Sequence, residues 1–392
     1  MKTKTFIEFL NKGEAPCDYE RQLLHNHLPR LKSILNGDNP PPYELEIQPS
    51  ATCNAQCQHC WAKTAKKLED RLTTKEAIER VIDQSIEFTD AGFRIEVIKF
   101  CGSTGDPLNN PLTLYAINLI SGKRKTRLFT NGIEIAKNIN NTEYLSTISK
   151  INRLNLSLDA GTSETLHQIK PGSQSIELEN ILKSVSKIRS ISSGMDIEVS
   201  YVITNQNYHE IAEAARKIRD YESGNRLKLR IDMVDRSVSE LHYDEILNQI
   251  ERAKDYSSPD FEIVPVHSKK QIKDSEEDHF GSQGLEIGCF TCKFWGCVGS
   301  SGEVYPCGHI VSADTPSYGN LFERDFKEIW NSPERMRVIS ELPSEKCRIC
   351  SPSSLRNNTF VNWLKQYSTS DISQMYEESK NRNKNDKIRI SG

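Results

Sequence analysis

Short strand-type segments alternate regularly with longer helix-type segments between residues 43 and 235, and this pattern restricts the fold more than any other feature. A helical period follows each strand pattern, as in NYHEIAEAARKIRDYES at 207–223. Strands that alternate with helices pair in parallel through right-handed crossovers. Six units predict an α/β fold with a partial (β/α)6 TIM-like barrel. The strand segments are YELEIQ (43–48), RIEVIKF (94–100), TRLFTNG (126–132), INRLNLSLDAG (151–161), DIEVSYVIT (196–204) and RLKLRIDMV (226–234).

Polar or cysteine-rich loops come at the ends of the first five predicted strands. Each loop alone also fits an ordinary turn. However, the loops after parallel strands gather at one edge of a barrel, where the active sites of such folds lie. We therefore expect these loops to share one site. They are CNAQCQHC (53–60), CGSTGDP (101–107), TNG (130–132), SLDA (157–160) and TNQN (204–207).

The composition is that of an ordinary globular protein. The chain has 392 residues, a formal net charge of −3 and 36% apolar residues, so it can bury a sizeable core, and its length favours more than one domain. It contains no apolar run of about 18 residues that could span a membrane, and its first residues lack a secretory signal pattern. Its basic stretches are short and isolated. We expect a cytoplasmic protein that binds neither membrane nor nucleic acid.

The chain has eleven cysteines. In a reducing compartment, clustered cysteines indicate metal binding or catalysis rather than disulfides. Cys53, Cys57 and Cys60 have the spacing C-x3-C-x2-C, and a four-iron cluster normally takes four thiolates, so three ligands leave one iron open. An open position is typical of a catalytic metal site. A zinc ion is the alternative, with His59 as the nearest fourth ligand.

The C-x3-C-x2-C spacing resembles the signature of the radical S-adenosylmethionine (SAM) enzymes. The resemblance implies that Cys53, Cys57 and Cys60 bind a [4Fe-4S] cluster whose open iron chelates the amino and carboxylate groups of SAM. It also implies that one electron cleaves SAM to methionine and a 5′-deoxyadenosyl radical, which abstracts hydrogen from a substrate C–H bond. A flavodoxin or ferredoxin is the reductant that this resemblance suggests.

The same resemblance implies a set of SAM-binding residues. Thr104, Gly105, Asp106 and Pro107 match the family's Gly-Gly-Glu-Pro segment, with Thr for the first Gly and Asp for Glu. His59 and Trp61 flank the last cysteine and are candidates to stack on the adenine. The remaining positions, expected near the ribose or methionine end of SAM, are Asn131, Ser157 and Asp159.

A cysteine-rich segment at 286–351 resembles the SPASM/twitch extension of radical SAM enzymes. It has a cysteine, G-x4-C from Gly302 to Cys307, GN, a helix with EIW, and C-x2-C. No cysteine follows Cys350, so the resemblance implies the shorter twitch form with one auxiliary [4Fe-4S] cluster. The implied ligands are Cys297, Cys307, Cys347 and Cys350.

This assignment gives Cys289 and Cys292 no role as cluster ligands. They could replace Cys297, form a zinc ribbon with the last two cysteines, or place a thiol near the substrate. Together with Cys101, which begins the loop after the second strand, they are candidate hydrogen donors to a substrate radical.

We expect five regions along the chain. These are an N-terminal helical extension (1–42), the radical SAM partial barrel (43–235), a connector or lid (236–285), the SPASM/twitch domain (286–351), and a C-terminal helix with a disordered tail (352–392).

The reaction expected from the single auxiliary cluster is oxidation or epimerisation of a polar small molecule such as a sugar or aminocyclitol. The alternative is a maturase that epimerises or crosslinks a ribosomally made peptide. A non-catalytic iron or zinc sensor is the third hypothesis, and it predicts no SAM cleavage.

Overall fold

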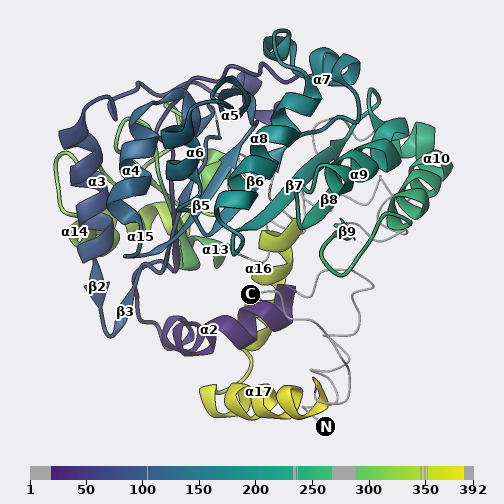
Figure 1. Ribbon diagram of the computed structural model, residues 1–392. Helices are drawn as coiled ribbons and strands as arrows, with labels where there is room; N and C mark the ends of the chain where they lie inside the picture. Colours follow the sequence, from purple (N-terminus) through teal and green to yellow (C-terminus); the bar gives the residue numbers. More distant parts are fainter. Residues whose placement is uncertain are drawn as a thin grey trace.

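A nine-stranded sheet runs through the centre of the molecule in the order β11-β10-β1-β4-β5-β6-β7-β8-β9 (Figure 1). The structure, a computed structural model, describes residues 19–103, 105–232, 235, 237–266, 288–344, 347, 350 and 352–383. All neighbouring strands are parallel except β10 and β11. The strands are β1 (Glu44–Ile47), β4 (Val97–Phe100), β5 (Lys125–Thr130), β6 (Arg153–Ser157), β7 (Asp196–Ile203), β8 (Arg226–Ile231), β9 (Glu262–Pro265), β10 (Trp295–Val298) and β11 (Val304–Tyr305).

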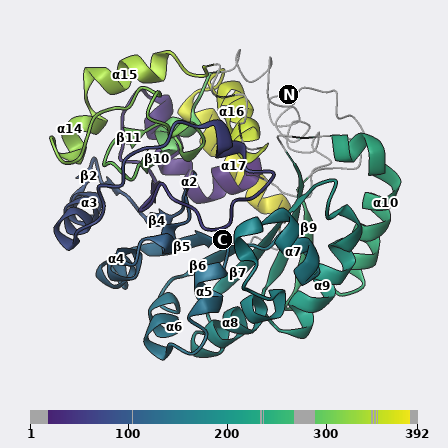
Figure 2. The ribbon, with the colours of Figure 1, turned by 90° about the horizontal axis from the view of Figure 1, so that it is seen from above.

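Helices cover the outer face of the curved sheet, as Figure 2 shows from above. This arrangement confirms the predicted partial barrel, whose six strands are β1 and β4 to β8. A short hairpin, β2 (Thr89–Asp90) with β3 (Phe93–Arg94), lies outside the main sheet. The outer helices are α3 (Lys75–Glu87), α4 (Leu112–Ile120), α5 (Ile133–Lys137), α6 (Thr142–Ile148), α7 (Ser163–Ile169), α8 (Leu178–Ile191), α9 (Ile211–Asp220) and α10 (Ser237–Lys254).

The inner face of the barrel is polar, and the outer face of its strands is apolar. Strand side chains alternate between the two faces of a sheet. In β8, Leu227, Leu229 and Ile231 are buried in the core shared with the helices. The alternate residues Arg226, Lys228 and Arg230 are partly exposed and face the interior of the barrel. The alternation therefore builds a dry core outside the sheet and a charged lumen inside it.

The C-terminal cysteine-rich segment is joined to the barrel through its strands. β10 pairs with β1 in parallel, from Glu44 opposite Trp295 to Ile47 opposite Val298. The other elements of this segment are α13 (Thr291–Phe294), η5 (Gly308–Ile310), α14 (Phe326–Trp330) and α15 (Pro333–Ser340). The expected connector at 236–285 begins with α10 and β9, which extend the barrel, whereas residues 267–287 lie outside the described residues.

Three further helices form a second apolar cluster at one end of the molecule (Figure 1). They are α2 (Tyr19–Leu35), α16 (Pro352–Leu364) and α17 (Thr369–Asn383), so helices occur where N- and C-terminal helices were expected. The expected disordered tail after Asn383 lies outside the described residues.

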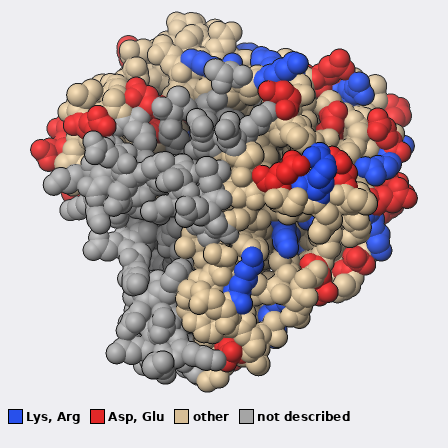
Figure 3. Space-filling model, turned by 180° about the vertical axis from the view of Figure 1, so that it is seen from behind, with Lys and Arg blue, Asp and Glu red and all other residues tan. Residues whose placement is uncertain are grey.

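Within the described chain, no helix has the length and hydropathy needed to cross a membrane. Acidic and basic side chains are interspersed over the described surface in Figure 3, in keeping with the small net charge.

Candidate functional site

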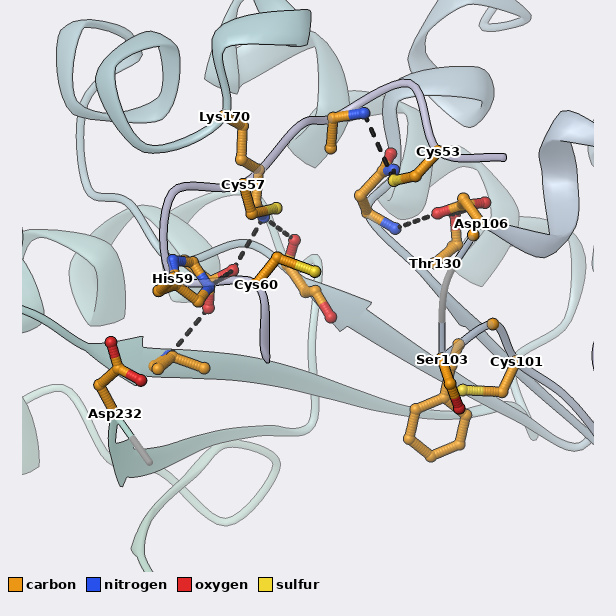
Figure 4. Close-up of a pocket in the computed structure, with 18 of the residues that line it drawn as sticks. Cys53, Cys57, His59, Cys60, Cys101, Ser103, Asp106, Thr130, Lys170 and Asp232 are labelled. Carbon is orange, nitrogen blue, oxygen red and sulfur yellow. Dashed lines mark hydrogen bonds and ion pairs between the residues drawn. The ribbon is translucent and has the colours of Figure 1, made fainter. Parts of the chain in front are cut away.

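A cavity of about 260 Å³ opens at the carboxyl ends of the barrel strands (Figure 4). Parallel strands place their following loops at this edge, which is why residues distant in sequence meet here. Thr104 lies outside the described residues, Pro107 is buried beside the cavity at the start of η2 (Pro107–Asn109), and Trp61 begins η1 (Trp61–Thr64). The lining includes these residues singled out from the sequence: Cys53, Cys57, His59, Cys60, Cys101, Gly105, Asp106, Asn131, Ser157 and Asp159.

The three clustered cysteines lie on the loop after β1 and line one side of the cavity (Figure 4). Burial raises the pKa of Cys57 to about 12, and burial likewise raises the pKa of Cys53. These thiols are therefore protonated until a metal displaces their protons. Within the described chain, no three His, Cys, Asp or Glu side chains are close enough to bind one ion. A cubane cluster fits this loop better than one zinc ion, because each thiolate then binds a different iron.

The turn after α7 supports the cysteine loop from behind. The Gly172 N–H, in η3 (Pro171–Ser173), donates to the Ala55 carbonyl at 3.0 Å, and the Gln58 N–H donates to the Ile169 carbonyl at 2.9 Å. A methyl group at Gly172 would overlap the carbonyl oxygen of Asn54. Only glycine allows this approach of two backbones. This support was missed in the sequence, where PGS resembles any turn.

Asp106 connects the loop after β4 to the end of β5. Its buried carboxylate accepts hydrogen bonds from the backbone N–H groups of Leu108 (3.0 Å) and Asn131 (2.8 Å) and from the Thr130 hydroxyl (3.0 Å). Burial raises the pKa of Asp106, and these hydrogen bonds oppose that shift. Most of its acceptor capacity is already used, so Asp106 mainly fixes the shape of the site.

Gly105 brings the loop after β4 close to the cysteine loop. A Cβ there would overlap the backbone of Ser50 and Thr52, and the neighbouring Asp106 N–H donates to the Thr52 carbonyl at 2.9 Å. The match to a glycine in the family segment thus has a steric reason in this chain.

Asn131 orients the cysteine loop from the end of β5. Its side-chain amide donates to Asn54 Oδ1 at 2.8 Å and lies 3.9 Å from Cys53 Sγ. Its Oδ1 accepts from the Ile133 N–H at 2.9 Å. With both ends of the amide held, Asn131 acts as a spacer between β5 and the loop that begins at Cys53.

A buried ion pair lies on the opposite side of the cysteines. Lys170 Nζ is 2.9 Å from Asp159 Oδ2 and donates to the carbonyl oxygens of Ser157 and Leu158. Burial is the largest influence on Asp159 and raises its pKa, but Lys170, His59 and the Val202 N–H together hold that pKa below its usual value. Ser157 and Asp159 were predicted from the sequence, whereas Lys170, which has no neighbouring motif, was not.

His59 extends this group toward the cavity. Its Nε2 is 3.8 Å from Asp159 Oδ2. Burial lowers the pKa of His59 below its usual value, against the opposing charge of Asp159. The imidazole is therefore neutral at pH 7, which suits contact with a neutral base better than with a cation.

The C-terminal cysteines fall into two groups. Cys307 is partly exposed, and desolvation together with the charges of Cys289, Cys347 and Cys350 raises its pKa. Cys297, on β10, lies instead against Glu46 of β1, with Sγ 3.8 Å from Oε1. Burial raises the pKa of Cys297 and Cys307 adds to that rise, so Cys289 and the expected Cys297 are both electrostatically linked to Cys307.

The three candidate hydrogen donors differ in position. Cys101 lines the cavity, and burial raises its pKa to about 12, so its S–H stays protonated beside the site. Cys289 and Cys292 are described but are not among the residues that line the cavity. Cys292 Sγ donates to the Cys289 carbonyl at 3.2 Å. The geometry supports the hypothesis of a cavity thiol for Cys101 alone.

A buried polar connection joins the cavity to the cysteine-rich segment. Gln48 Nε2 donates to Glu46 Oε1 and to Ser103 Oγ, each at 2.6 Å, and Ser103 Oγ donates to the Gly308 carbonyl. Lys99 Nζ lies 2.5 Å from Glu46 Oε2. The loop beside SAM's expected position is thus hydrogen-bonded to the loop that carries Cys307.

Comparisons with known proteins agree with this geometry. Residues 47–218 match the radical SAM superfamily, and residues 289–351 match SPASM, an iron-sulfur cluster-binding domain. An AdoMet-dependent heme synthase of Methanosarcina barkeri is 27% identical over 324 residues, which span 77% of this chain and 86% of that protein. A protein of the same name from Nitratidesulfovibrio vulgaris is 24% identical over 324 residues, which span 76% of this chain and 82% of that protein.

The fold also has a solved counterpart. The crystal structure of Streptococcus suis SuiB bound to S-adenosylmethionine superposes with a TM-score of 0.56 at 16% identity, over 84% of this chain and 75% of SuiB. At this identity the likeness concerns the fold alone. The two domain matches and the predicted barrel agree: the chain is a radical SAM protein with a C-terminal SPASM domain.

Proposed function

We propose that this chain binds SAM at a [4Fe-4S] cluster on Cys53, Cys57 and Cys60 and starts a radical reaction on a substrate in the adjoining cavity. When bound, the cluster supplies the electron that cleaves SAM to methionine and a 5′-deoxyadenosyl radical. The observation that carries this proposal is that the three cysteines line the same cavity as the loops after β4, β5 and β6. Radical SAM enzymes use a cluster and SAM of this kind.

The residues around the cluster would hold SAM rather than react with it. The loop at Gly105 and Asp106, fixed by hydrogen bonds to β5, presents its backbone to the amino group of SAM. Neutral His59 offers a flat face to the adenine. Ser157 and Asn131 remain candidates for the ribose or methionine end. A closed set of hydrogen bonds keeps this surface in one shape before SAM binds.

For the auxiliary site, we propose four thiolate ligands, Cys289, Cys307, Cys347 and Cys350. The influence of Cys289, Cys347 and Cys350 on the pKa of Cys307 supports this set. Cys297, whose pKa responds to Cys307, has the Glu46 carboxylate beside its thiol. Four thiolates complete the coordination of a [4Fe-4S] cluster, which suits electron transfer without an open iron. A flavodoxin or ferredoxin is the reductant that we propose for the SAM-binding cluster.

The substrate class that we propose is a tetrapyrrole on the way to heme. Both curated relatives are named AdoMet-dependent heme synthase, and the first shares 27% identity over most of both chains. Neither relative is named for a sugar, an aminocyclitol or a peptide. We therefore propose a tetrapyrrole in place of the substrates expected from the sequence. Basic side chains such as Arg230 in the cavity suit an acidic substrate of this kind.

The first experiment measures iron and sulfide per chain after anaerobic reconstitution, together with 5′-deoxyadenosine formed from SAM under reduction. We expect about eight irons in the wild type and about four in the triple Cys53, Cys57 and Cys60 to Ala variant, which should form no deoxyadenosine. C289A should lose the auxiliary iron, and the matched control C297A should keep it. A fully loaded wild type that forms no deoxyadenosine contradicts the proposed function.

Heme is the product for which the relatives are named, so it also serves as a first ligand. Added anaerobically to the reconstituted protein, heme should bind with a shifted Soret absorption band. If heme fails to bind while SAM is cleaved, the tetrapyrrole proposal is wrong and the radical chemistry stands.

A further inference from the structure

A ladder of ion pairs connects β7 and β8 on the inner face of the barrel. Arg226 Nη1 lies 2.9 Å from Asp196 Oδ2, and Lys228 Nζ lies 3.5 Å from Glu198 Oε1. These basic residues occupy alternate positions of β8, so the next residue on the same face is Arg230. The ladder balances the charge of the lower lumen without any ligand.

The ladder stops before Arg230. The residue opposite Arg230 on β7 is Val202, and β9 on the other side ends at Pro265, opposite Leu229. Throughout the described part of the chain, Arg230 makes no hydrogen bond or ion pair. The nearest carboxylate on the neighbouring loop, that of Asp159, is already engaged by Lys170 at 2.9 Å. Arg230 thus lines the cavity, and no described residue takes up its hydrogen-bond donors.

A partly buried guanidinium with no partner among the described residues is costly. Burial lowers the pKa of Arg230, and the negative charges of Asp159 and Asp232 offset this only in part. A guanidinium carries five N–H donors in a planar fork that matches a carboxylate. An anion that entered the cavity would therefore satisfy donors that the described residues leave open.

Arg230 also lies on the side of the cavity away from the SAM loop. In Figure 4, Asp232, two residues further along the same chain segment, lies on the other side of the cysteines from Asp106 and Thr130. The amino and carboxylate groups of SAM would lie together at the open iron, near the loop of Gly105 and Asp106, so Arg230 on β8 is left to a carboxylate of the substrate. We propose that Arg230 binds a carboxylate of the substrate and thereby selects acidic tetrapyrroles.

This inference rests on the proposed function, because it assigns the substrate of the same cavity. Heme itself carries two propionate groups, so a heme-type substrate offers the required carboxylate. SAM is the second source of a carboxylate in the site, and the test separates the two sources.

The experiment compares matched ligands on the reconstituted holoenzyme. Protoporphyrin IX is paired with its dimethyl ester, and SAM is paired with decarboxylated SAM. Dissociation constants for both pairs are measured in the wild type, R230Q, R230K and K228Q. K228Q is the matched control, because Lys228 lies on the same strand and face but pairs with Glu198.

We expect the wild type to prefer the porphyrin diacid to its diester by about 10- to 100-fold, the range for hydrogen bonds to charged groups. R230Q should lose this preference, R230K should keep part of it, and K228Q should keep all of it. The ratio of the dissociation constants of SAM and decarboxylated SAM should be the same in R230Q as in the wild type. If R230Q changes the SAM ratio instead, Arg230 binds the carboxylate of SAM.

Two results would overturn the inference. If both ratios in R230Q stay within about twofold of the wild type, Arg230 anchors no carboxylate. A wild type that cleaves SAM yet binds diacid and diester alike refutes the acidic tetrapyrrole and leaves the proposed radical chemistry intact. A wild type that cleaves no SAM refutes the proposed function itself.

Discussion

At the scale of single residues, the site is held in shape by buried polar groups that use most of their hydrogen bonds on the protein. Asp106 is the clearest case, with three donors on one carboxylate. Such groups position a ligand by fixing the surface that it meets. Arg230 is different, since it lines the cavity and no described residue takes up its donors.

For Asp106, we expect D106N to lower the free energy of unfolding by about 1–3 kcal/mol. The new side-chain amide would place its N–H₂ group against N–H and hydroxyl donors that now bind a carboxylate oxygen, and one of these donors would lose its acceptor. The affinity for SAM should fall as well, because the loop at Gly105 loses its link to β5. Urea unfolding and SAM titration measure the two effects. The control D260N, at an exposed loop position, should change stability by less than about 0.5 kcal/mol. Equal SAM affinity in D106N and the wild type would contradict the positioning role.

The ion pair of Lys170 and Asp159 gives a prediction about pH. K170M leaves a buried carboxylate without its main partner, which should cost about 3–5 kcal/mol at pH 7. The folded-state pKa of Asp159 lies below its usual value. The pair's contribution is therefore present above about pH 4 and is lost as the pH falls through the folded pKa.

The cost of K170M should accordingly shrink at acidic pH, where Asp159 takes up a proton. Urea unfolding of the metal-free protein at a series of pH values measures this change. A cost that stays constant as the pH falls well below 4 would show that Asp159 is not the group responsible.

At the scale of elements, the cysteine loop depends on the turn that supports it. We expect G172A to push η3 away from Asn54 and so to reduce the iron bound at Cys53, Cys57 and Cys60. Iron per chain should fall toward about four, the content of the auxiliary cluster alone. G194A is the matched control, because a Cβ at Gly194 meets no atom within 4 Å. Unchanged iron in G172A would mean that the loop can bind its cluster without this support.

At the scale of the whole molecule, Trp330 joins three distant parts of the chain. It is fully buried, its Nε1 donates to the Pro40 carbonyl at 2.9 Å, and its ring packs near Phe88 and under the Arg335 guanidinium at 3.7 Å. We expect W330A to lower the free energy of unfolding by about 3–5 kcal/mol.

Urea unfolding measured by circular dichroism checks this value. The control M336A, on the neighbouring helix α15 with a side chain 55% exposed, should have little effect. If the barrel unfolds in W330A at the same urea concentration as in the wild type while the C-terminal segment is lost, the two parts are not one cooperative unit.

The sequence predicted the six-stranded barrel and the cysteine loop, because both depend on local patterns. Period-two strands, helical periods and the C-x3-C-x2-C spacing are all contained in short windows. Lys170 and Arg230 could not be found this way, because their importance comes from what lies across the cavity. The pairing of β10 with β1 likewise depends on contacts between residues far apart in sequence.

The pairing of β1 with β10 has a consequence for how the protein is made. A ribosome releases β1 early, whereas β10 emerges near the end of synthesis, so one edge of β1 stays open for most of that time. Open strand edges attract other chains, and folding during synthesis proceeds from the N-terminus. The cysteine loop follows β1 directly. The strand that leads into this loop therefore gains its second neighbour only after β10 has been synthesised, so the two ends of the barrel sheet are completed at different times.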